Sequence, residues 1–372
     1  MLTKNHYPEK WWGIRKNHYN NIIIGKSYRR RDIIDTQIEA AKEGKIQALP
    51  NKFIVIDTRD RLYHEYQKTM KNMGYKTKKL LINGVGITER YDPFKYISSA
   101  SDISVLSDLI SSVGNQDTNY PIDVETFLLN IVFAIVVDQG QTFETASNIL
   151  KLTSFTGAKS TVLEKMIKDI GDESLRNYAS VTYERLIKCI PNVLAASYAN
   201  VMAKMSSFEH TYIESMFKDD TIKDDLLSDE KFILFIEMPE ENSILNIPTT
   251  VLVGQLLNYA MQNIYNLAYI VDDYDILYRY FPRIEQIAAI NRTVYLVLLV
   301  ENAMHLYKKM DFSKLANKMQ TIVVAKNFVS DSVNDMVLKY IDSPVPNLLT
   351  VKDEDMIAVV DDKDCVLHIY KG

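Results

Sequence analysis

The residue types that could do chemistry gather at two strand ends near the start of the chain. Gly25 ends a short β-branched run and Asp57 ends a second apolar run, so both fall where parallel sheets bind ligands. Arg29, Arg30 and Arg31 follow Gly25 at the start of a helical pattern. Arginines at a helix start can hold an anion or a phosphate-containing ligand. A plain basic surface is the simpler interpretation, and both stay open.

The amino-terminal segment has a second pattern, in which aromatic rings alternate with cations. Residues 1–31 contain eight basic side chains and one acid, whereas residues 209–242 contain eleven acids and three lysines. Rings and cations together suit stacking and phosphate contact with single-stranded nucleic acid. They equally suit docking on an acidic protein, such as the acidic stretch of a second subunit, and we slightly favour docking. The candidate contact residues are Lys10, Trp11, Trp12, Arg15, Lys16 and Arg29.

Composition excludes several other kinds of chemistry. The chain has 47% hydrophobic and 24% charged residues, which is globular rather than disordered. Its two cysteines and six histidines show no metal-ligand spacing, so we expect no metal site and a reducing compartment. We find no signal peptide and no apolar run long enough to cross a bilayer, so the sequence predicts a cytoplasmic protein. Glycine is scarce, at 12 of 372 residues.

The elements that must position these residues begin with alternating strands and helices. Strands are expected at 21–25, 52–57 and 75–82, with helices at 32–45 and 63–73 between them. This order predicts a doubly wound, mostly parallel sheet. Later apolar runs at 231–237, 295–300, 321–325, 348–350 and 365–370 extend the sheet, and a long helix is expected at 249–267.

The middle of the chain has a different texture, with helical periodicity and few β-branched runs. Helices are expected at 103–113, 124–137, 142–152, 159–170 and 177–205. We therefore divide the chain into a basic aromatic segment (1–20), an all-α insert domain (101–207), and a discontinuous α/β domain (21–100 and 208–372).

Five segments in series resemble the TraG family of type IV coupling proteins, which are RecA-like ATPases of conjugation and type IV secretion. They are Ile22–Asp32, Val55–Tyr63, Gly74–Ile97, Glu237–Asn246 and Leu349–Lys363, the last with Thr350, Glu354 and the Asp-Asp-Lys of 361–363. Their order and spacing cover most of residues 20–370. The resemblance implies a RecA-like P-loop-type nucleotide-binding domain interrupted by an all-α domain. It also implies membrane helices before the first motif, and this sequence has none there.

The resemblance places the family's Walker A loop at 25–32, where Gly25, Lys26 and Ser27 open the loop. That loop needs a glycine, a lysine and a Ser/Thr at its end to wrap the phosphates and hold Mg²⁺. The corresponding positions here are Arg30, Arg31 and Asp32. Arg30 has a side chain where backbone freedom is required, and Arg31 has a planar guanidinium instead of a compact ammonium.

The family's Walker B strand is matched to 295–301, and it too departs from the pattern. Val300 precedes Glu301 where the family has Asp-Glu, so Glu301 is a remnant acid without a metal-holding neighbour. A one-residue slip, with Glu301 as the metal acid, is the alternative. Lys326 stands where the family's next strand ends in glutamine. We interpret Asp57 as a cap or turn residue. The alternative hypothesis is that it belongs to the nucleotide-binding site.

Three altered parts of one site predict a coupling-protein-like scaffold or regulatory subunit without ATP turnover. No cofactor is expected, and ATP with Mg²⁺ would be one only if the divergent site still binds them. The expected partners are secretion or conjugation subunits, further copies of the chain, and DNA. A working ATPase motor and a nucleic-acid binder that uses residues 1–31 are the alternatives.

Overall fold

The structure, a computed structural model, describes residues 20–24, 38, 49–58, 61–82, 89–114, 122–140, 142–238, 245–282, 284–301, 314–315, 318–319, 321–325 and 356–360. The chain divides into two compact units, each described by itself below. The first comprises residues 1–78, 229–237 and 260–372, and the second comprises residues 79–228 and 238–259. The predicted insert at 101–207 falls within the second unit, and its boundaries stay a prediction.

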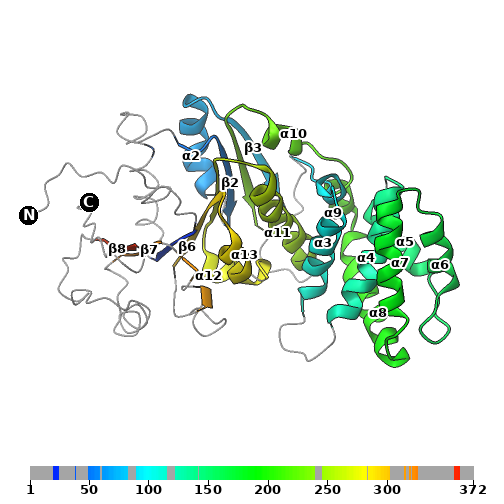
Figure 1. Cartoon of the computed structure of the whole chain (residues 1–372). Coiled ribbons are helices and arrows are strands. Elements are labelled where there is room, and N and C mark those ends of the chain that lie inside the picture. The colour runs from blue at the N-terminus through cyan, green and yellow to red at the C-terminus, as the bar shows by residue number, and fades with distance from the viewer. Residues whose placement is uncertain are drawn as a thin grey trace, which may run out of the picture. The chain divides into compact units, whose positions relative to one another are not determined.

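One eight-stranded sheet organises the first unit (Figure 1), in the order β3-β4-β2-β5-β6-β1-β7-β8, although the last three residues of β3 are assigned to the second unit. Its strands are β1 (Asn20–Ile24), β2 (Lys52–Asp57), β3 (Lys76–Leu81), β4 (Phe232–Glu237), β5 (Leu267–Val271), β6 (Val294–Val300), β7 (Thr321–Ala325) and β8 (Met356–Val360). From β4 to β7 the paired strands are parallel, and β8 runs antiparallel to β7.

The strands β2, β4, β5 and β6 are almost entirely buried on both faces, which explains why they are continuous apolar runs rather than alternating ones. On one face, α2 (Arg61–Asn72) packs Leu62, Tyr66 and Met70, which are spaced one helical turn apart, against strand residues such as Phe53 and Phe235. On the other face, the ring of Tyr269 in β5 packs edge-on against the ring of Phe281, with 6.4 Å between the ring centroids. Figure 1 shows α2 on one side of the sheet and α13 (Ile284–Ile290) on the other.

Helix α2 ends where the sequence predicts a stop. Gly74 has φ +85°, a left-handed conformation that glycine adopts without a steric penalty. The N–H of Tyr75 donates to the carbonyl of Met70 at 3.0 Å, which closes the helix end. The chain then enters β3, so the predicted helix and strand on either side of Gly74 are confirmed.

The second unit is built from helices between residues 100 and 263. They are α3 (Ala100–Ser112), α4 (Ile122–Asp138), α5 (Phe143–Leu152), α6 (Thr161–Lys168), α7 (Glu173–Leu186), α8 (Pro191–Met205), α9 (Thr211–Met216), α10 (Lys223–Leu227) and α11 (Asn246–Asn263), the last four residues of which belong to the first unit. The prediction of one helix over 177–205 is wrong. Pro191 starts a new helix there, because its ring fixes φ but cannot donate an interior hydrogen bond.

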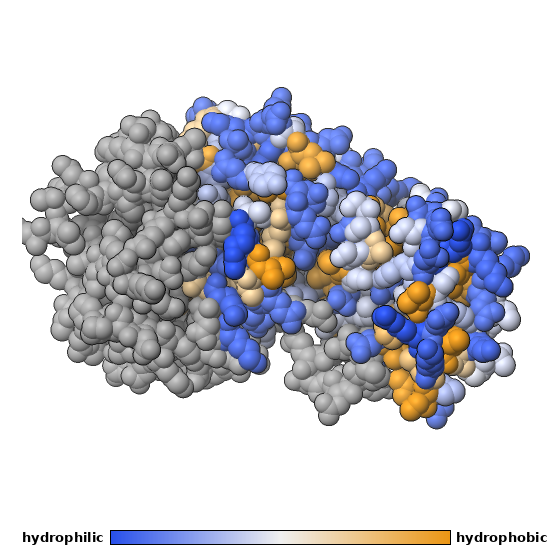
Figure 2. All heavy atoms as spheres, in the orientation of Figure 1, coloured by the Kyte–Doolittle hydropathy of each residue, from blue (hydrophilic) through white to orange (hydrophobic). Residues whose placement is uncertain are grey.

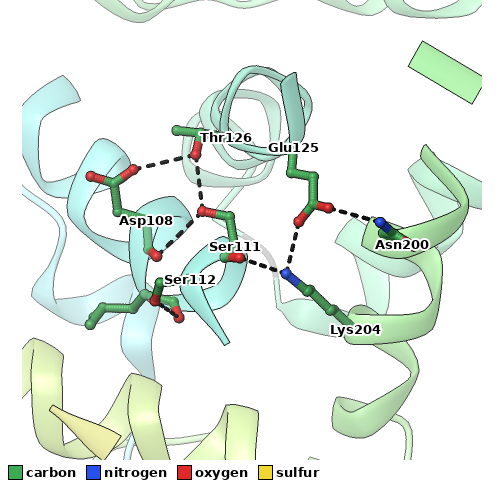
Figure 3. A network of polar contacts seen from close by, with 8 residues as sticks. Asp108, Ser111, Ser112, Glu125, Thr126, Asn200 and Lys204 are labelled. Atoms are coloured by element: carbon green, nitrogen blue, oxygen red, sulfur yellow. Dashed lines mark hydrogen bonds and ion pairs between the residues drawn. The ribbon is translucent and has the colours of Figure 1, made fainter. Parts of the chain in front are cut away.

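A buried polar network joins three helices of the second unit (Figure 3). Lys204 of α8 donates to Glu125 of α4 at 2.8 Å and to the carbonyl of Ser111, near the end of α3, at 2.6 Å. The other carboxylate oxygen of Glu125 accepts from Asn200 at 3.1 Å. Glu125 is 1% exposed, so this network satisfies a charge that the helical core would otherwise leave unpaired.

Two strands of the sheet, β5 and β8, were not predicted from the sequence. The helix predicted over 249–267 stops at Asn263, and Leu267–Val271 is the buried strand β5. The strand Met356–Val360 was not predicted. The strands expected at 348–350 and 365–370 lie outside the described residues, as does the helix expected at 32–45 apart from Ile38, which is helical and buried.

Candidate functional site at the carboxyl edge of the sheet

The strand order defines where a ligand site would lie. From β1 the chain crosses the sheet past β6 and β5 toward β2. From β6 it crosses in the opposite direction, past β1, to β7. Neighbouring strands whose connections leave in opposite directions form the topological switch point of an α/β sheet. Here that point lies between β1 and β6, where Ile24 pairs with Val300. The next residues along the chain are Gly25, singled out from the sequence as a strand end, and Glu301, the remnant acid of the strand matched to Walker B.

Most of the predicted site residues lie outside the described residues. This holds for the loop residues Gly25, Lys26, Ser27, Arg30, Arg31 and Asp32, and for Lys10, Trp11, Trp12, Arg15, Lys16 and Arg29. The structure describes Asp57 and Glu301. Asp57 is the last residue of β2 and Glu301 follows β6, and β5 lies between these two strands in the sheet. Their roles and those of the loop residues therefore stay predictions.

Asp57 is buried and serves the backbone of the following helix. Its Oδ2 accepts from the N–H groups of Leu62, at 2.7 Å, and Tyr63, at 3.3 Å. These two N–H groups lie in the first turn of α2, where the helix itself offers no acceptor. A carboxylate at this position also faces the positive end of the helix dipole. The geometry agrees with the capping interpretation of Asp57.

Glu301 follows β6 directly and is partly exposed. Its backbone N–H donates to the carboxylate of Asp275 at 2.9 Å. Asp275 belongs to the short helix α12 (Tyr274–Leu277), which follows β5, and it is 3% exposed. The end of β6 is therefore tied to the segment that follows β5.

Two further acids at this edge were missed from the sequence. Asp272 and Asp273 follow β5, and both are almost fully buried. The N–H of Asp272 donates to the carbonyl of Ile56 at 2.9 Å, which continues the pairing of β5 with β2. The signal was available in the apolar run Leu267–Val271 followed by two aspartates. It was hidden because the apolar pattern of the preceding helix runs into it without a glycine or proline.

The carboxylate of Asp273 is already engaged by two side chains that follow β2. The hydroxyl of Thr58 donates to Oδ2 at 2.7 Å, and Nη2 of Arg61 lies 3.6 Å from the same oxygen. Asp273 also has positive φ, at +47°, and its carbonyl accepts from Ile276 and Leu277 in α12. A left-handed aspartate is strained, and such strain is retained where surrounding contacts fix the residue.

The aromatic side chain next to this acid is protonated over the physiological range. Tyr274 is fully buried, and burial raises the pKa of its phenol well above the usual value, with Glu285 and then Tyr278 adding to the shift. Within the described part of the chain, its hydroxyl has no hydrogen-bond partner. Tyr274 is therefore a neutral packing residue behind the acidic edge and not a base.

A metal ion at this edge would need several donor side chains grouped around it. Among the residues that the structure describes, no three or more His, Cys, Asp or Glu side chains are grouped so as to hold a metal ion. Mg²⁺ prefers one or two carboxylates together with substrate phosphates. Asp272 is a donor of that kind, whereas the Asp273 carboxylate is paired with a guanidinium and a hydroxyl and does not fit Mg²⁺ in this arrangement.

The surface adds a second feature. Figure 2 shows a largely hydrophilic face with hydrophobic residues gathered in places over the helices of the second unit. Large apolar side chains that are exposed in the second unit include Leu152 at 66%, Ile190 at 67% and Val181 at 51%. None of the described helices has the length and apolar character needed to cross a membrane.

The parallel sheet, its switch point and the acids at its carboxyl edge define an α/β fold of the RecA-like type, as predicted. Among solved structures, the fold is similar to that of the bacterial conjugative coupling protein TrwB lacking 70 amino-terminal residues. For the sulphate complex the TM-score is 0.58 at 11% identity, and the match covers 87% of this chain and 74% of that truncated chain. For the unbound monoclinic form the TM-score is 0.59 at 9% identity, and the match covers 92% of this chain and 82% of that chain.

A third TrwB structure is a complex with ADP and Mg²⁺, with a TM-score of 0.56 at 12% identity, covering 92% of this chain and 82% of that one. No protein-family model matches the sequence. The comparison with curated proteins finds no match either. The resemblance noted from motifs is thus confirmed at the level of the fold, which this chain shares with a coupling protein.

Proposed function

We propose that the protein is a coupling-protein-like component of conjugative DNA transfer or type IV secretion, and that it acts as a scaffold or regulatory subunit. Two independent supports agree. One is the series of five motif-like segments in the sequence, and the other is the TrwB-like fold over 87% or more of the chain. The partners would be other subunits of the apparatus, further copies of this chain, or DNA. Its location would be the cytoplasm, at the inner face of the membrane.

The proposed scaffold does not turn over ATP. The observation that carries this point is the engagement of the Asp273 carboxylate by Thr58 and Arg61. A general base must be free to accept a proton within hydrogen-bond reach of its donor. A carboxylate that is held by a cation and a hydroxyl is poorly suited to that task. The sequence supports the same conclusion, since Arg30, Arg31 and Asp32 replace the loop residues that handle phosphate, and Val300 precedes Glu301.

The loop from Gly25 to Asp32 and the strand-end residues Asp57 and Glu301 are the proposed remnant of the nucleotide site. Arg30 and Arg31 could still bind a phosphate without hydrolysis, because two guanidinium groups offer bidentate contacts to an anion. Mg²⁺ would then contribute charge neutralisation of the phosphates. Nucleotide binding and nucleotide turnover are therefore separate questions for this chain.

The deciding experiment measures phosphate release by the purified full chain with ATP, Mg²⁺ and single- or double-stranded DNA. We expect a rate no higher than that of the Asp272→Asn/Glu301→Gln double variant. Binding of a fluorescent ATP analogue, followed in parallel, separates a protein that binds without turnover from one that does not bind. DNA-stimulated turnover that Glu301→Gln abolishes would overturn the proposal.

A working ATPase motor is the second candidate, and one observation favours it. The sheet places the pair Asp272 and Asp273 after β5, so two acids are present at this edge besides Glu301. In a motor that uses this pair, Asp272→Asn would abolish turnover, whereas Glu301→Gln would leave it unchanged. The same phosphate-release assay with both variants therefore also locates the acid that matters.

A further inference from the structure

The two faces of the sheet in the first unit are packed to different degrees. On the face away from α2, Ile54 and Ile56 of β2 are 0% exposed. On the face that α2 covers, Val55 of the same strand is 4% exposed. The alternation continues in the neighbouring strands, where Ile233 of β4 and Ile270 of β5 are each 3% exposed and the residues on either side of them are fully buried. The packing on the α2 face therefore leaves a gap.

That gap is a cavity of about 30 Å³ between α2 and the sheet. Val55, Ile233 and Ile270 line it from the sheet, and Leu62 and Met70 line it from α2. One water molecule needs about 10–15 Å³ of such space, so the cavity has room for more than one. No polar atom of the lining faces the space, however, and a buried water needs polar partners. The cavity therefore suits an apolar occupant better than it suits water.

Leu62 connects the cavity to the carboxyl edge of the sheet. Its side chain lines the cavity, and its N–H donates to Oδ2 of Asp57, the last residue of β2, at 2.7 Å. An occupant that packs against Leu62 adds dispersion contacts to the first turn of α2, the same turn that the strand-end carboxylate holds. Filling the cavity thus favours the docked position of this helix.

We propose that this cavity is a binding site for a small apolar molecule of a few carbon atoms without hydrogen-bonding groups, and that its occupancy stabilises α2 against β2, β4 and β5. The lining determines this class of ligand. An apolar molecule gains contacts with side chains that now face empty space. A polar or charged molecule would lose its hydration and find no partner in return.

The first test follows the isoleucine methyl groups of the full chain by NMR under increasing xenon pressure, since xenon is an apolar probe that enters dry cavities. We expect the signals of Ile233 and Ile270, which line the cavity, to shift and then saturate. Ile54 and Ile56 lie on the opposite face of the same sheet and should keep their positions. Shifts of all four residues, or of none, would overturn the proposal.

A matched pair of substitutions adds one methylene group to each face. Val55→Ile extends a side chain into the cavity, so it should raise the Tm by about 2 °C and reduce the xenon shifts of Ile233 and Ile270 by half or more. Val294→Ile makes the same change in β6, at a fully buried position on the opposite face. Overpacking there should lower the Tm by about 2–6 °C and leave the xenon shifts unchanged.

The variants can also refute the proposal. A Val55→Ile protein that loses stability or does not fold would show that the space is already filled, and equal changes of Tm in the two variants would show that both faces are packed alike. Xenon shifts that persist in full after Val55→Ile would place the probe elsewhere. If Val294→Ile does not fold, the xenon response of Val55→Ile decides alone. None of these measurements involves nucleotide, so their outcome is independent of whether the protein proves to be a scaffold or a motor.

Discussion

At the residue scale, Asp57 shows how one strand-end carboxylate can be read as a cap or as a ligand of nucleotide. Its Oδ2 accepts from two N–H groups in the first turn of α2, at 2.7 and 3.3 Å. Both roles require an oxygen acceptor at that position, but only binding of a cation–phosphate group requires a negative charge. The two roles can therefore be separated by removing the charge and keeping the acceptor.

For Asp57→Asn we expect nearly unchanged stability, because the amide oxygen can still accept from the helix. Asp57→Ala should lower the free energy of unfolding by about 1–2 kcal/mol, the usual cost of losing a cap. Chemical denaturation of the two variants beside the unsubstituted protein measures the difference. Equal losses for Asn and Ala would mean that the charge of Asp57, and not its capping oxygen, is what the fold requires.

Asp92 gives a pH-dependent prediction at the same scale. Burial raises the pKa of this carboxyl above its ordinary value of 3.8, Asp220 and Asp219 raise it further, and the Phe94 N–H and Lys95 oppose the shift. A folded-state pKa above the unfolded one means that the folded state binds the proton more tightly. The Asp92 contribution to stability therefore falls as pH rises through the interval above 3.8.

Asp92→Asn removes that charge, and the amide oxygen can still accept from Phe94, as Oδ1 of Asp92 does now at 3.0 Å. The variant should be more stable than the unsubstituted protein at neutral pH. The gain should shrink as pH falls toward the ordinary pKa, where Asp92 itself becomes neutral. Urea unfolding at several pH values measures this, and a gain that grows on acidification would contradict the assigned direction.

At the element scale, the Glu125–Lys204 pair fixes the ends of α3 and α4 against α8. Lys204 bonds both the Glu125 carboxylate and the carbonyl of Ser111 near the carboxyl end of α3, so it complements an acid and a helix dipole together. Since Glu125 is 1% and Lys204 12% exposed, solvent screens the pair little.

Lys204→Ala should lower the free energy of unfolding by about 3–5 kcal/mol, since it leaves Glu125 buried without its cation. The matched variant Glu125→Gln/Lys204→Met removes both charges at similar volume, and it should be less destabilised than Lys204→Ala. Denaturant midpoints measured at low and high salt test both statements. A double variant as damaged as the single one would show that the hydrogen bonds of Lys204, rather than an unpaired Glu125 charge, account for the stability of this junction.

The elements also show what could be predicted from sequence. The strands of the α/β part with strong β-branched runs, β1, β2, β4, β6 and β7, were predicted, because a strand buried on both faces needs apolar residues throughout. The strand β5 was missed because the break before it is Asn266, with φ +58°, and not a glycine or proline. The acids Asp272 and Asp273 were missed with it, since a strand-end site can be predicted only when its strand is.

At the scale of the whole molecule, the amino-terminal segment offers a test of the nucleic-acid hypothesis. Residues 1–19 contain four basic side chains, Lys4, Lys10, Arg15 and Lys16, with both tryptophans between them. If these four cations contact phosphates, affinity for single-stranded DNA should fall about 50-fold between about 50 and 200 mM salt. A chain that begins at Asn20 should lose this binding and its salt dependence.

Fluorescence anisotropy with a labelled oligonucleotide measures both affinities. The variant Trp11→Ala/Trp12→Ala keeps every charge and is the control for stacking, with an expected loss of affinity and an unchanged salt slope. Binding of the full chain that does not respond to salt would contradict the hypothesis. It would leave docking on an acidic protein surface as the use of this segment.

The sheet has a consequence for how the protein is made. β1 is the first strand among the described residues, yet its neighbours in the sheet are β6 and β7, and the Asn20 side chain donates to a carbonyl 268 positions away. A chain emerging from the ribosome therefore holds an apolar strand without its pairing partners until most of the protein has been synthesised. The helices of the second unit contact one another over shorter sequence separations, so they can form before β1 pairs with its neighbours. Assembly of the sheet is thus a late event in synthesis, completed from the carboxyl-terminal third of the chain.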